Sequence, residues 1–404
     1  MPQFPEASDE DQSIVQTAYS RRSTRAYPIP ATFLALMLCL ISAKVTAVAP
    51  VPSSPAIAAT GHILIDFNSG SILSEKNADG RLEPASLTKI MTAYVVLREL
   101  KEGNITLVDE VPVSEKAWRT PGSRMFIEVD TRVSVEQLLK GMIIQSGNDA
   151  SVALAEHIAG SEDTFARLMN QHAKRLGMHA TNFVNSTGLP HPDHYTTARD
   201  IAKVSEATIR EFPEYYPWYA EKIFTYNGIK QHNRNKLLWR DDSIDGVKTG
   251  HTEAAGYCLV TSALRDGMRL TSVVMGTTSE KERANQSLAL LNYGFRFFET
   301  HRLYGAGDVL HRSRVWKGHK ERLSMGLSKD LYITIPRGHY QDLSAGMDVK
   351  PKIMAPIAKG SEMGRVTVVL EGETVADVPL IALESIDEGG IMRFVTDSVL
   401  LWFE

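Results

Sequence analysis

The chain has 404 residues, 43% of them apolar, and a formal net charge of −4. This length leaves room for two or three domains, and the apolar content is sufficient for a sizeable core. A small negative charge over the whole chain argues against nucleic acid as the partner. No glycine-rich phosphate loop and no histidine or cysteine cluster with metal-ligand spacing occurs, so we expect neither a cofactor nor a metal.

Residues 1–49 have the layout of an N-terminal extension followed by a secretory signal. Basic residues at 21–25 precede an apolar segment at 31–43, and small residues continue to Ala49. Basic, apolar and small, in that order, is typical of a cleavable signal, and the apolar segment is short for a membrane span. We therefore expect export with cleavage after Ala49 or two residues earlier, and an uncleaved anchor helix is the alternative.

The two cysteines differ in what they indicate. Cys39 lies inside the expected signal, so the mature chain has a single thiol and forms no internal disulfide. That thiol, Cys258, lies in an apolar stretch typical of a buried strand, which favours a core thiol over a nucleophile.

Residues 50–305 alternate between strand and helix patterns. The patterns predict a strand at 62–67 with its return at 71–74, helices at 87–100, 134–144, 149–160 and 161–177, a hairpin of 256–263 and 268–275, and a helix at 279–298. Asp266-Gly267 is a strong turn signal for the hairpin. Strands interleaved with helices predict a sheet that carries helices on both faces.

Residues 306–388 have a different hydrophobic pattern. Short alternating runs, such as those at 331–335 and 366–370, predict strands, and no catalytic cluster is apparent among them. This part of the chain is expected to be a small all-β domain.

Residues 389–404 begin with the break Gly389-Gly390, and the residues after it predict a terminal amphipathic helix. Its apolar residues share one helix face: Met392, Val395, Val399, Trp402 and Phe403. The segment is far too short to span a bilayer, but it could lie in the membrane interface, with little electrostatic attraction because it contains no Lys. A terminal helix packed on its own domain is the alternative.

The first of three short motifs is Ser86-Leu87-Thr88-Lys89, at the start of the predicted buried helix. A serine in the first turn has free backbone N–H groups and the positive end of the helix beneath it. Lys89 falls on the same helix face as Ser86, within reach of its hydroxyl. A partly desolvated lysine beside another cation loses its proton more easily and can act as a base. Alone, this motif is common and is usually a surface helix cap.

The second motif, Ser146-Gly147-Asn148, lies between two predicted helices. Its serine can relay a proton, and its asparagine offers a carbonyl and an amide to a peptide bond. The third motif, Lys248-Thr249-Gly250, precedes the hairpin. It supplies a positive charge, a hydroxyl for a carboxylate, and a glycine that lets another chain approach the strand closely. Each motif is ordinary alone, but the three in this order indicate one catalytic site.

Together the motifs resemble those of penicillin-recognising serine enzymes. The flanking residues resemble low-molecular-mass penicillin-binding proteins of the D-alanyl-D-alanine carboxypeptidase type. The stretches that carry this resemblance are 84–92, 145–150, 185–189, 196–200 and 248–252. The resemblance runs from about residue 59 to the last residue. It implies a mixed α/β penicillin-binding/β-lactamase-like transpeptidase domain, with a central antiparallel sheet flanked by helices, and a small all-β domain and a C-terminal amphipathic helix after it.

The expected domains are accordingly an extension and signal peptide at 1–49, a catalytic domain at 50–305, a β-rich domain at 306–388 and a membrane-associating helix at 389–404.

The resemblance also implies catalytic roles for the residues that match the family's motifs. Ser86 corresponds to the acylated nucleophile and Lys89 to its proton acceptor. Ser146 corresponds to a proton relay, and Asn148 to a residue that holds the substrate peptide. The backbone N–H groups of Ser86 and His251 correspond to the oxyanion hole, where preorganised donors contribute a factor of about a hundred or more.

Substrate recognition is implied in the same way. Lys248 and Thr249 correspond to residues that face the substrate carboxylate, with Gly250 beside them. Arg283 matches a family arginine that helps to bind the terminal carboxylate, and a solvated arginine on a helix face is the alternative.

The implied function is a serine-type carboxypeptidase that removes the terminal D-Ala of peptidoglycan stem pentapeptides through an acyl-enzyme, with β-lactam antibiotics as covalent inhibitors. A β-lactamase, a D,D-endopeptidase on the same fold and a non-catalytic wall-peptide sensor are the alternatives. A β-lactamase usually needs a Glu positioned with an Asn on a loop, and no such signature occurs between 161 and 233. A sensor would be favoured by a missing nucleophile or base, and both are present. The signal, the single mature thiol and the tail predict a periplasmic enzyme attached peripherally to the outer face of the inner membrane.

Overall fold

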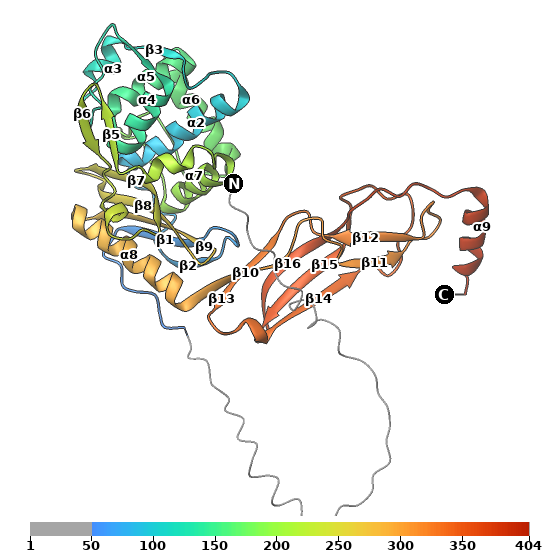
Figure 1. The fold of residues 1–404 in the computed structure, drawn as a ribbon. Coiled ribbons are helices and arrows are strands. Elements are labelled where there is room, and N and C mark those ends of the chain that lie inside the picture. The colour runs from blue at the N-terminus through green and yellow to red at the C-terminus, as the bar shows by residue number, and fades with distance from the viewer. Residues whose placement is uncertain (1–50, 404) are drawn as a thin grey trace, which may run out of the picture. The chain divides into compact units, whose positions relative to one another are not determined.

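The computed structural model describes residues 51–403, so the extension and signal expected at 1–49 lie outside the described residues (Figure 1). The helices and strands of its first part are β1 (Gly61–Asp66), β2 (Ile72–Lys76), α2 (Thr88–Glu102), β3 (Glu110–Pro112), α3 (Glu115–Arg119), β4 (Arg132–Ser134), α4 (Val135–Lys140), α5 (Asn148–Ala159), α6 (Glu162–Arg175), α7 (Ala198–Glu211), β5 (Ile223–Tyr226), β6 (Ile229–His232), β7 (Ile244–Thr252), β8 (Gly256–Arg265), β9 (Met268–Thr277) and α8 (Glu280–Phe297).

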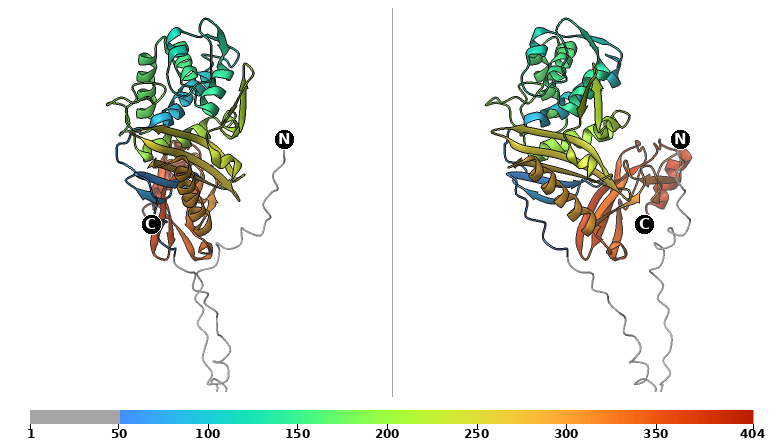
Figure 2. Two further views of the ribbon diagram at one scale, coloured as in Figure 1. Left: turned by 90° about the vertical axis from the view of Figure 1, so that its left-hand side faces the viewer. Right: turned by 60° about the vertical axis from the view of Figure 1, so that its left-hand side comes forward.

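A five-stranded antiparallel sheet organises this first part, with the strand order β2-β1-β9-β8-β7. Successive side chains of a strand point to opposite faces, and β1 illustrates the result. Ile63 and Ile65 pack in the core formed with α2, α5 and α7, whereas Leu64 packs in a second core with Leu290 of α8. The sheet therefore has helices on both faces, as the sequence predicts (Figures 1 and 2).

Helix α2 is the buried helix predicted at 87–100. Its first ten residues are all buried, and all of them are apolar except Thr88, Lys89 and Thr92. The helix ends at Gly103, which adopts the left-handed conformation with φ 77°. A 3₁₀ turn, Ala85–Leu87, leads into the helix and carries Ser86.

The helix predicted at 134–144 is shorter than expected. Helix α4 begins after Ser134, whose side chain accepts a hydrogen bond from the N–H of Gln137, and ends at Lys140. A π-helical turn, Gly141–Gln145, follows it. Such turns inside helical segments are frequent at functional sites. Here Ser146 directly follows the turn.

Helix α7 and the β5–β6 hairpin are not among the predicted elements. Both have sequence signals: Thr197 caps α7 by accepting a hydrogen bond from the N–H of Asp200, and Asn227-Gly228 forms the hairpin turn with both residues at positive φ. The hairpin strands are short and half-exposed, so they lack the alternation of a longer strand.

The rest of the chain consists of strands apart from a short 3₁₀ turn and a last helix, and its first strand begins at Phe298, before the boundary predicted at 306. Its strands are β10 (Phe298–Tyr304), β11 (His311–Arg314), β12 (Arg322–Gly326), β13 (Leu331–Pro336), β14 (Leu343–Val349), β15 (Glu362–Leu370) and β16 (Glu373–Ala382). They form the sheet β11-β12-β16-β15-β14 and the pair β10-β13. Alternate residues of β15, such as Val366 and Val368, pack in a hydrophobic core formed within this part of the chain.

Helix α9 (Ile391–Leu400) ends the described chain. Within residues 51–403 the structure has no helix with both the length and the apolar character needed to cross a membrane.

Candidate active site

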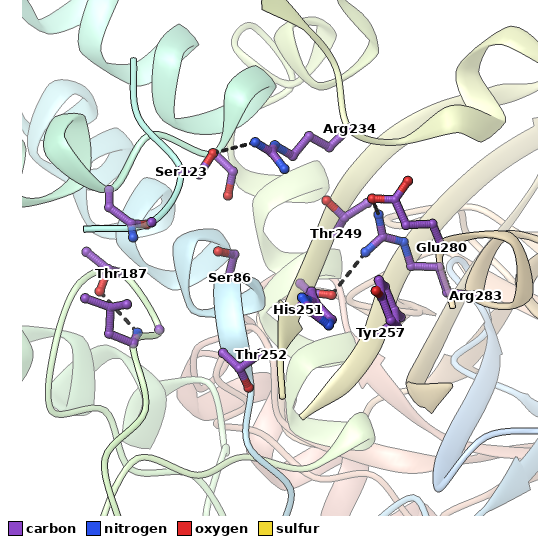
Figure 3. A pocket seen from close by; sticks show the side chains of 16 residues that line it. Ser86, Ser123, Thr187, Arg234, Thr249, His251, Thr252, Tyr257, Glu280 and Arg283 are labelled. Atoms are coloured by element: carbon purple, nitrogen blue, oxygen red, sulfur yellow. Dashed lines mark hydrogen bonds and ion pairs between the residues drawn. The ribbon is translucent and has the colours of Figure 1, made fainter. Parts of the chain in front are cut away.

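The three motifs line one pocket of about 420 Å³. The residues that line it are Ser86, Gly122, Ser123, Ser146, Asn148, Thr187, Gly188, Leu189, Arg234, Thr249, Gly250, His251, Thr252, Tyr257, Glu280 and Arg283. In the close view, Ser86 lies between Thr187 on one side and Thr249 and His251 on the other (Figure 3).

Ser86 is presented to the pocket by a tightly fitted turn. Its neighbour Ala85 has φ 46°, in the left-handed region that non-glycine residues rarely adopt. A Cβ on Gly250 of β7 would lie 3.1 Å from the carbonyl oxygen of Pro84, so the missing side chain lets the strand and this turn pack together. The glycine of the third motif therefore makes room for the chain's own serine turn.

Lys89 lies beneath the serine and is almost fully buried, with a relative exposure of 1%. Its Nζ donates to Ser86 Oγ at 3.0 Å, to Asn148 Oδ1 at 2.6 Å and to the carbonyl oxygen of Thr187 at 2.6 Å. Burial and, to a lesser extent, the positive charge of Arg234 lower the pKa of Lys89 to about 7, against the opposing effect of the Asp149 and Glu162 carboxylates. The amine is thus close to half neutral at neutral pH.

These contacts also orient the amine. A neutral amine has two N–H donors and one lone pair. When Asn148 Oδ1 and the Thr187 carbonyl accept the two donors, the lone pair faces Ser86 Oγ. The arrangement can therefore remove the proton of the serine hydroxyl.

Ser146 and Asn148 come from the turn between α4 and α5. Ser146 has φ 71°, and its buried Oγ has no hydrogen-bond partner within the described residues. Backbone strain of this kind is frequent at functional sites. Asn148 is engaged at both ends, since its Oδ1 accepts from Lys89 and its Nδ2 donates to the carbonyl oxygen of Pro121 at 2.6 Å. In this structure the asparagine thus orients the lysine, while the hydroxyl of Ser146 is available to a substrate.

The third motif lies on β7, the edge strand of the sheet, directly before the β8–β9 hairpin. Lys248 is buried, and its Nζ donates to the carbonyl oxygen of Thr249 at 3.2 Å. Burial holds the pKa of Lys248 well below its usual range, and the charges of Lys89, Arg234 and Arg283 act in the same direction. An anionic group beside Lys248 would raise the pKa of its amine and stabilise the ammonium form, so the site favours a carboxylate.

Arg283 is not a solvated arginine. It lies in the first turn of α8, is buried, and donates to the carbonyl oxygen of Gly250 at 3.2 Å. Its guanidinium is 5.6 Å from the ring centre of Tyr257 and 3.5 Å from the carboxylate of Glu280 (Figure 3). Tyr257 in turn stacks on His251 with the ring centres 3.9 Å apart.

Arg234 is a cation of this pocket that the sequence did not reveal. It donates to the carbonyl oxygen of Gln145 at 3.0 Å and to Ser123 Oγ at 2.9 Å (Figure 3). The arginine follows β6 on an irregular segment, outside any motif. Glu280 has no sequence signal for a place in the pocket either, because only the tertiary fold brings it there. Thr187 lies in the stretch 185–189 that carries the family resemblance, but the sequence assigned it no role.

A serine on a strained turn above a buried lysine, beside a cationic edge strand, is the arrangement of the penicillin-recognising serine enzymes. A family model described as D-alanyl-D-alanine carboxypeptidase matches residues 47–279, and one described as penicillin-binding protein 5, C-terminal domain, matches residues 298–388. The chain belongs to the D-alanyl-D-alanine carboxypeptidase family of serine-type peptidases in the penicillin-binding class.

Individual relatives extend this likeness over most of the chain. D-alanyl-D-alanine carboxypeptidase DacA of Escherichia coli K12 is 44% identical over 361 residues, which cover 87% of this chain and 90% of the relative. Penicillin-binding protein 5 from Haemophilus influenzae has a TM-score of 0.81 at 43% identity, over 83% of this chain and 100% of that one. Penicillin-binding protein D2 from Listeria monocytogenes, in its ampicillin-bound form, has a TM-score of 0.56 at 29% identity, over 60% of this chain and 100% of that one.

Proposed function

We propose that the protein removes the terminal D-Ala of peptidoglycan stem pentapeptides through an acyl-enzyme on Ser86. Neutral Lys89 takes the proton of the Ser86 hydroxyl as Oγ attacks the carbonyl carbon of the penultimate D-Ala. The terminal D-Ala then leaves with a proton on its nitrogen, and water hydrolyses the ester. The observation that carries this proposal is the lysine with a pKa of about 7, whose two acceptors aim its lone pair at Ser86 Oγ.

Further groups around Ser86 would assist the reaction. The backbone N–H groups of Ser86 and His251 would stabilise the negative charge on the carbonyl oxygen in the transition state. The hydroxyl of Ser146, which has no hydrogen-bond partner among residues 51–403, is available to pass a proton to the leaving nitrogen. Asn148 would orient Lys89, because its Oδ1 accepts a hydrogen bond from Lys89 while its Nδ2 donates to the carbonyl oxygen of Pro121.

The specificity for a free C-terminus would come from the cations at β7 and α8. Lys248 and Arg283 lie there with the hydroxyl of Thr249, and Arg234 is close by. In the absence of substrate, Glu280 pairs with Arg283 at 3.5 Å. A substrate carboxylate would add charge-assisted hydrogen bonds to these groups, worth about 1.5–3 kcal/mol each.

The direct test uses diacetyl-L-Lys-D-Ala-D-Ala and its C-terminal amide. Free D-Ala should be released from the acid, and kcat/KM for the amide should be lower by roughly 10²-fold or more because of the lost carboxylate contacts. Comparable turnover of the acid and the amide would favour an endopeptidase. Absence of D-Ala release by a protein that still binds the peptide would favour a wall-peptide sensor.

A β-lactam should acylate the same serine, since it presents a reactive carbonyl and a carboxylate in one molecule. A β-lactamase would hydrolyse that adduct rapidly. Among residues 51–403, no glutamate or aspartate lines the pocket beside Ser86, where it could activate a water. The carboxylate that these residues place in the lining is that of Glu280, which pairs with Arg283. We therefore expect a persistent adduct.

We further propose that the protein is periplasmic and is held on the outer face of the inner membrane by α9. The helix packs on its own domain through a polar face, because buried Asp397 accepts the N–H of Lys317 at 2.6 Å and pairs with Arg393 at 3.2 Å. Its apolar residues face solvent instead: Ile391, Met392, Phe394, Val395, Val399, Leu400, Trp402 and Phe403. A surface helix normally buries its apolar face, so this reversal supports insertion into a membrane interface.

Truncation after Gly390 tests the attachment. The truncated protein should appear in the soluble fraction and keep full activity on a short peptide, because the catalytic pocket lies in the first part of the chain. High salt should release little of the intact protein, since apolar burial provides most of the binding. If the truncated protein still sediments with membranes, the N-terminal segment is the anchor.

A further inference from the structure

His194 is a buried histidine directly behind the catalytic turn, and it does not line the pocket. Its relative exposure is 2%, and its ring packs edge-on against Phe183 with the ring centres 5.7 Å apart. The N–H of Val184 donates to Nδ1 at 3.3 Å, so the ring proton lies on Nε2. Nε2 is 2.8 Å from the Oγ1 of Thr88, to which it donates.

Thr88 belongs to the turn that carries the proposed nucleophile and base. It lies between Ser86 and Lys89 and is completely buried. The bond from His194 therefore ties the start of α2 to a distant segment of the chain.

That segment is the loop 182–195, whose ends pair through the bridge between Asn182 and Tyr195. The same loop supplies the Thr187 carbonyl that accepts from Lys89. A Cβ on Gly188 would lie 1.8 Å from the carbonyl oxygen of Ala85, so the loop and the serine turn are in close contact. The loop thus meets the catalytic turn at both His194 and Thr187.

The imidazole is neutral under working conditions. Burial, assisted by the charges of His191 and Lys89, lowers the pKa of His194 to about 4, against the opposing effect of the Glu162 carboxylate. A neutral donor ties the loop to the turn without adding a cation near Lys89. The amine of Lys89 is already influenced by Arg234, Asp149, Glu162 and Lys248.

We propose that His194 is a positioning residue for the proton acceptor. Its Nε2–H bond to Thr88 holds the loop 182–195 in register with α2, so that the Thr187 carbonyl keeps the lone pair of Lys89 directed at Ser86 Oγ. The proposal rests on the roles proposed above for Ser86 and Lys89. It assigns a function in the reaction to a residue that does not touch the substrate.

The test measures the second-order rate constant of acylation by a fluorescent penicillin as a function of pH. His194→Leu should lower the constant by roughly 10- to 100-fold, the loss expected for a displaced catalytic group. The midpoint of its pH dependence should rise from about 7, because a loosened loop admits water to Lys89 and relieves its desolvation. His194→Gln, whose amide can donate to Thr88, should recover most of the rate.

Thr88→Val provides the second arm, because it removes the acceptor and keeps the side-chain volume. The double variant with His194→Leu should be no slower than the slower single variant, since both changes remove the same interaction. His62→Leu is the matched control: His62 is also buried and hydrogen-bonded, to Ser74 at 3.2 Å, but lies outside the pocket. It should lower the melting temperature without moving the pH midpoint.

Three results would overturn the proposal. They are a wild-type rate in His194→Leu, a midpoint that stays in place or falls, and additive losses in the double variant. Failure of the proposed function itself is distinguishable, because the wild-type protein would then show no acylation at Ser86 at any pH.

Discussion

Lys89 is the residue on which the chemistry depends, because the same burial that positions it also makes it a base. An ordinary lysine is almost fully protonated at neutral pH. Here burial lowers the pKa to about 7, so the ammonium form dominates below pH 7 and the neutral amine above it. Acylation should accordingly increase as pH rises through about 7 and level off in the mildly alkaline range.

Substituting Lys89→Arg separates a base from a mere positive charge. Arginine keeps the charge and cannot lose its proton, so the variant should bind penicillin and acylate more slowly by roughly 10²- to 10⁴-fold at every pH. Stopped-flow acylation rates between pH 5 and 9 would measure both effects. A Lys89→Arg protein with a near-normal rate would mean that the base lies elsewhere.

The sequence identified the residues within motifs better than those between them. Ser86, Lys89 and Ser146 were found because their spacing is fixed by a helix turn or a short loop. Arg234 was not found, and Thr187 was marked only as part of the stretch 185–189 without a role, because each reaches the pocket from an irregular segment through contacts that only the folded chain creates. Their residue types carry no signal of their own.

At the level of elements, the fit between the loop 182–195 and the turn before α2 is the critical contact. Gly188 has φ +82°, and a Cβ there would lie 1.8 Å from the carbonyl oxygen of Ala85. Gly188→Ala should lower stability by the cost of a left-handed alanine, about 1–2 kcal/mol, and by a further ~1–3 kcal/mol from overpacking. It should also slow acylation, because the Thr187 carbonyl on the same loop is displaced.

Gly267 provides the control for this prediction. It has φ +78°, and nothing lies within 4 Å of the Cβ position. Gly267→Ala should therefore lose only the conformational part of the stability and keep the wild-type acylation rate. Thermal unfolding and acylation rates of both variants would separate the conformational cost from the effect of the close contact. Equal effects on acylation would show that the close contact at Gly188 does not matter for the reaction.

Elements with a strong periodic pattern were predictable, and those specified by local chemistry alone were not. The β8–β9 hairpin and α2 matched their predicted ranges within a few residues, since each has a long uninterrupted pattern. The β5–β6 hairpin was missed although Asn227-Gly228 marks its turn, because its strands have four residues each. The π-helical turn before Ser146 has no sequence signal, and it sets the conformation of that serine.

At the level of the whole molecule, the orientation of α9 shows what a helical pattern leaves open. The sequence predicted an amphipathic helix but could not say which face packs on the protein. That choice depends on Asp397, whose partners at Lys317 and Arg314 lie about 80 residues earlier in the chain. With the polar face docked, Trp402 remains 92% exposed. The proposed membrane attachment follows from this tertiary contact.

Three segments that are distant in the chain meet around one serine, so the proposed function depends on acylation of Ser86. Intact-mass analysis after treatment with penicillin, followed by peptide mapping, detects this acylation. One adduct of the mass of the intact antibiotic should appear, on the peptide that contains Ser86, and none should form on Ser86→Ala protein of unchanged melting temperature. An adduct on any other residue, or an adduct on the Ser86→Ala protein, would contradict the account.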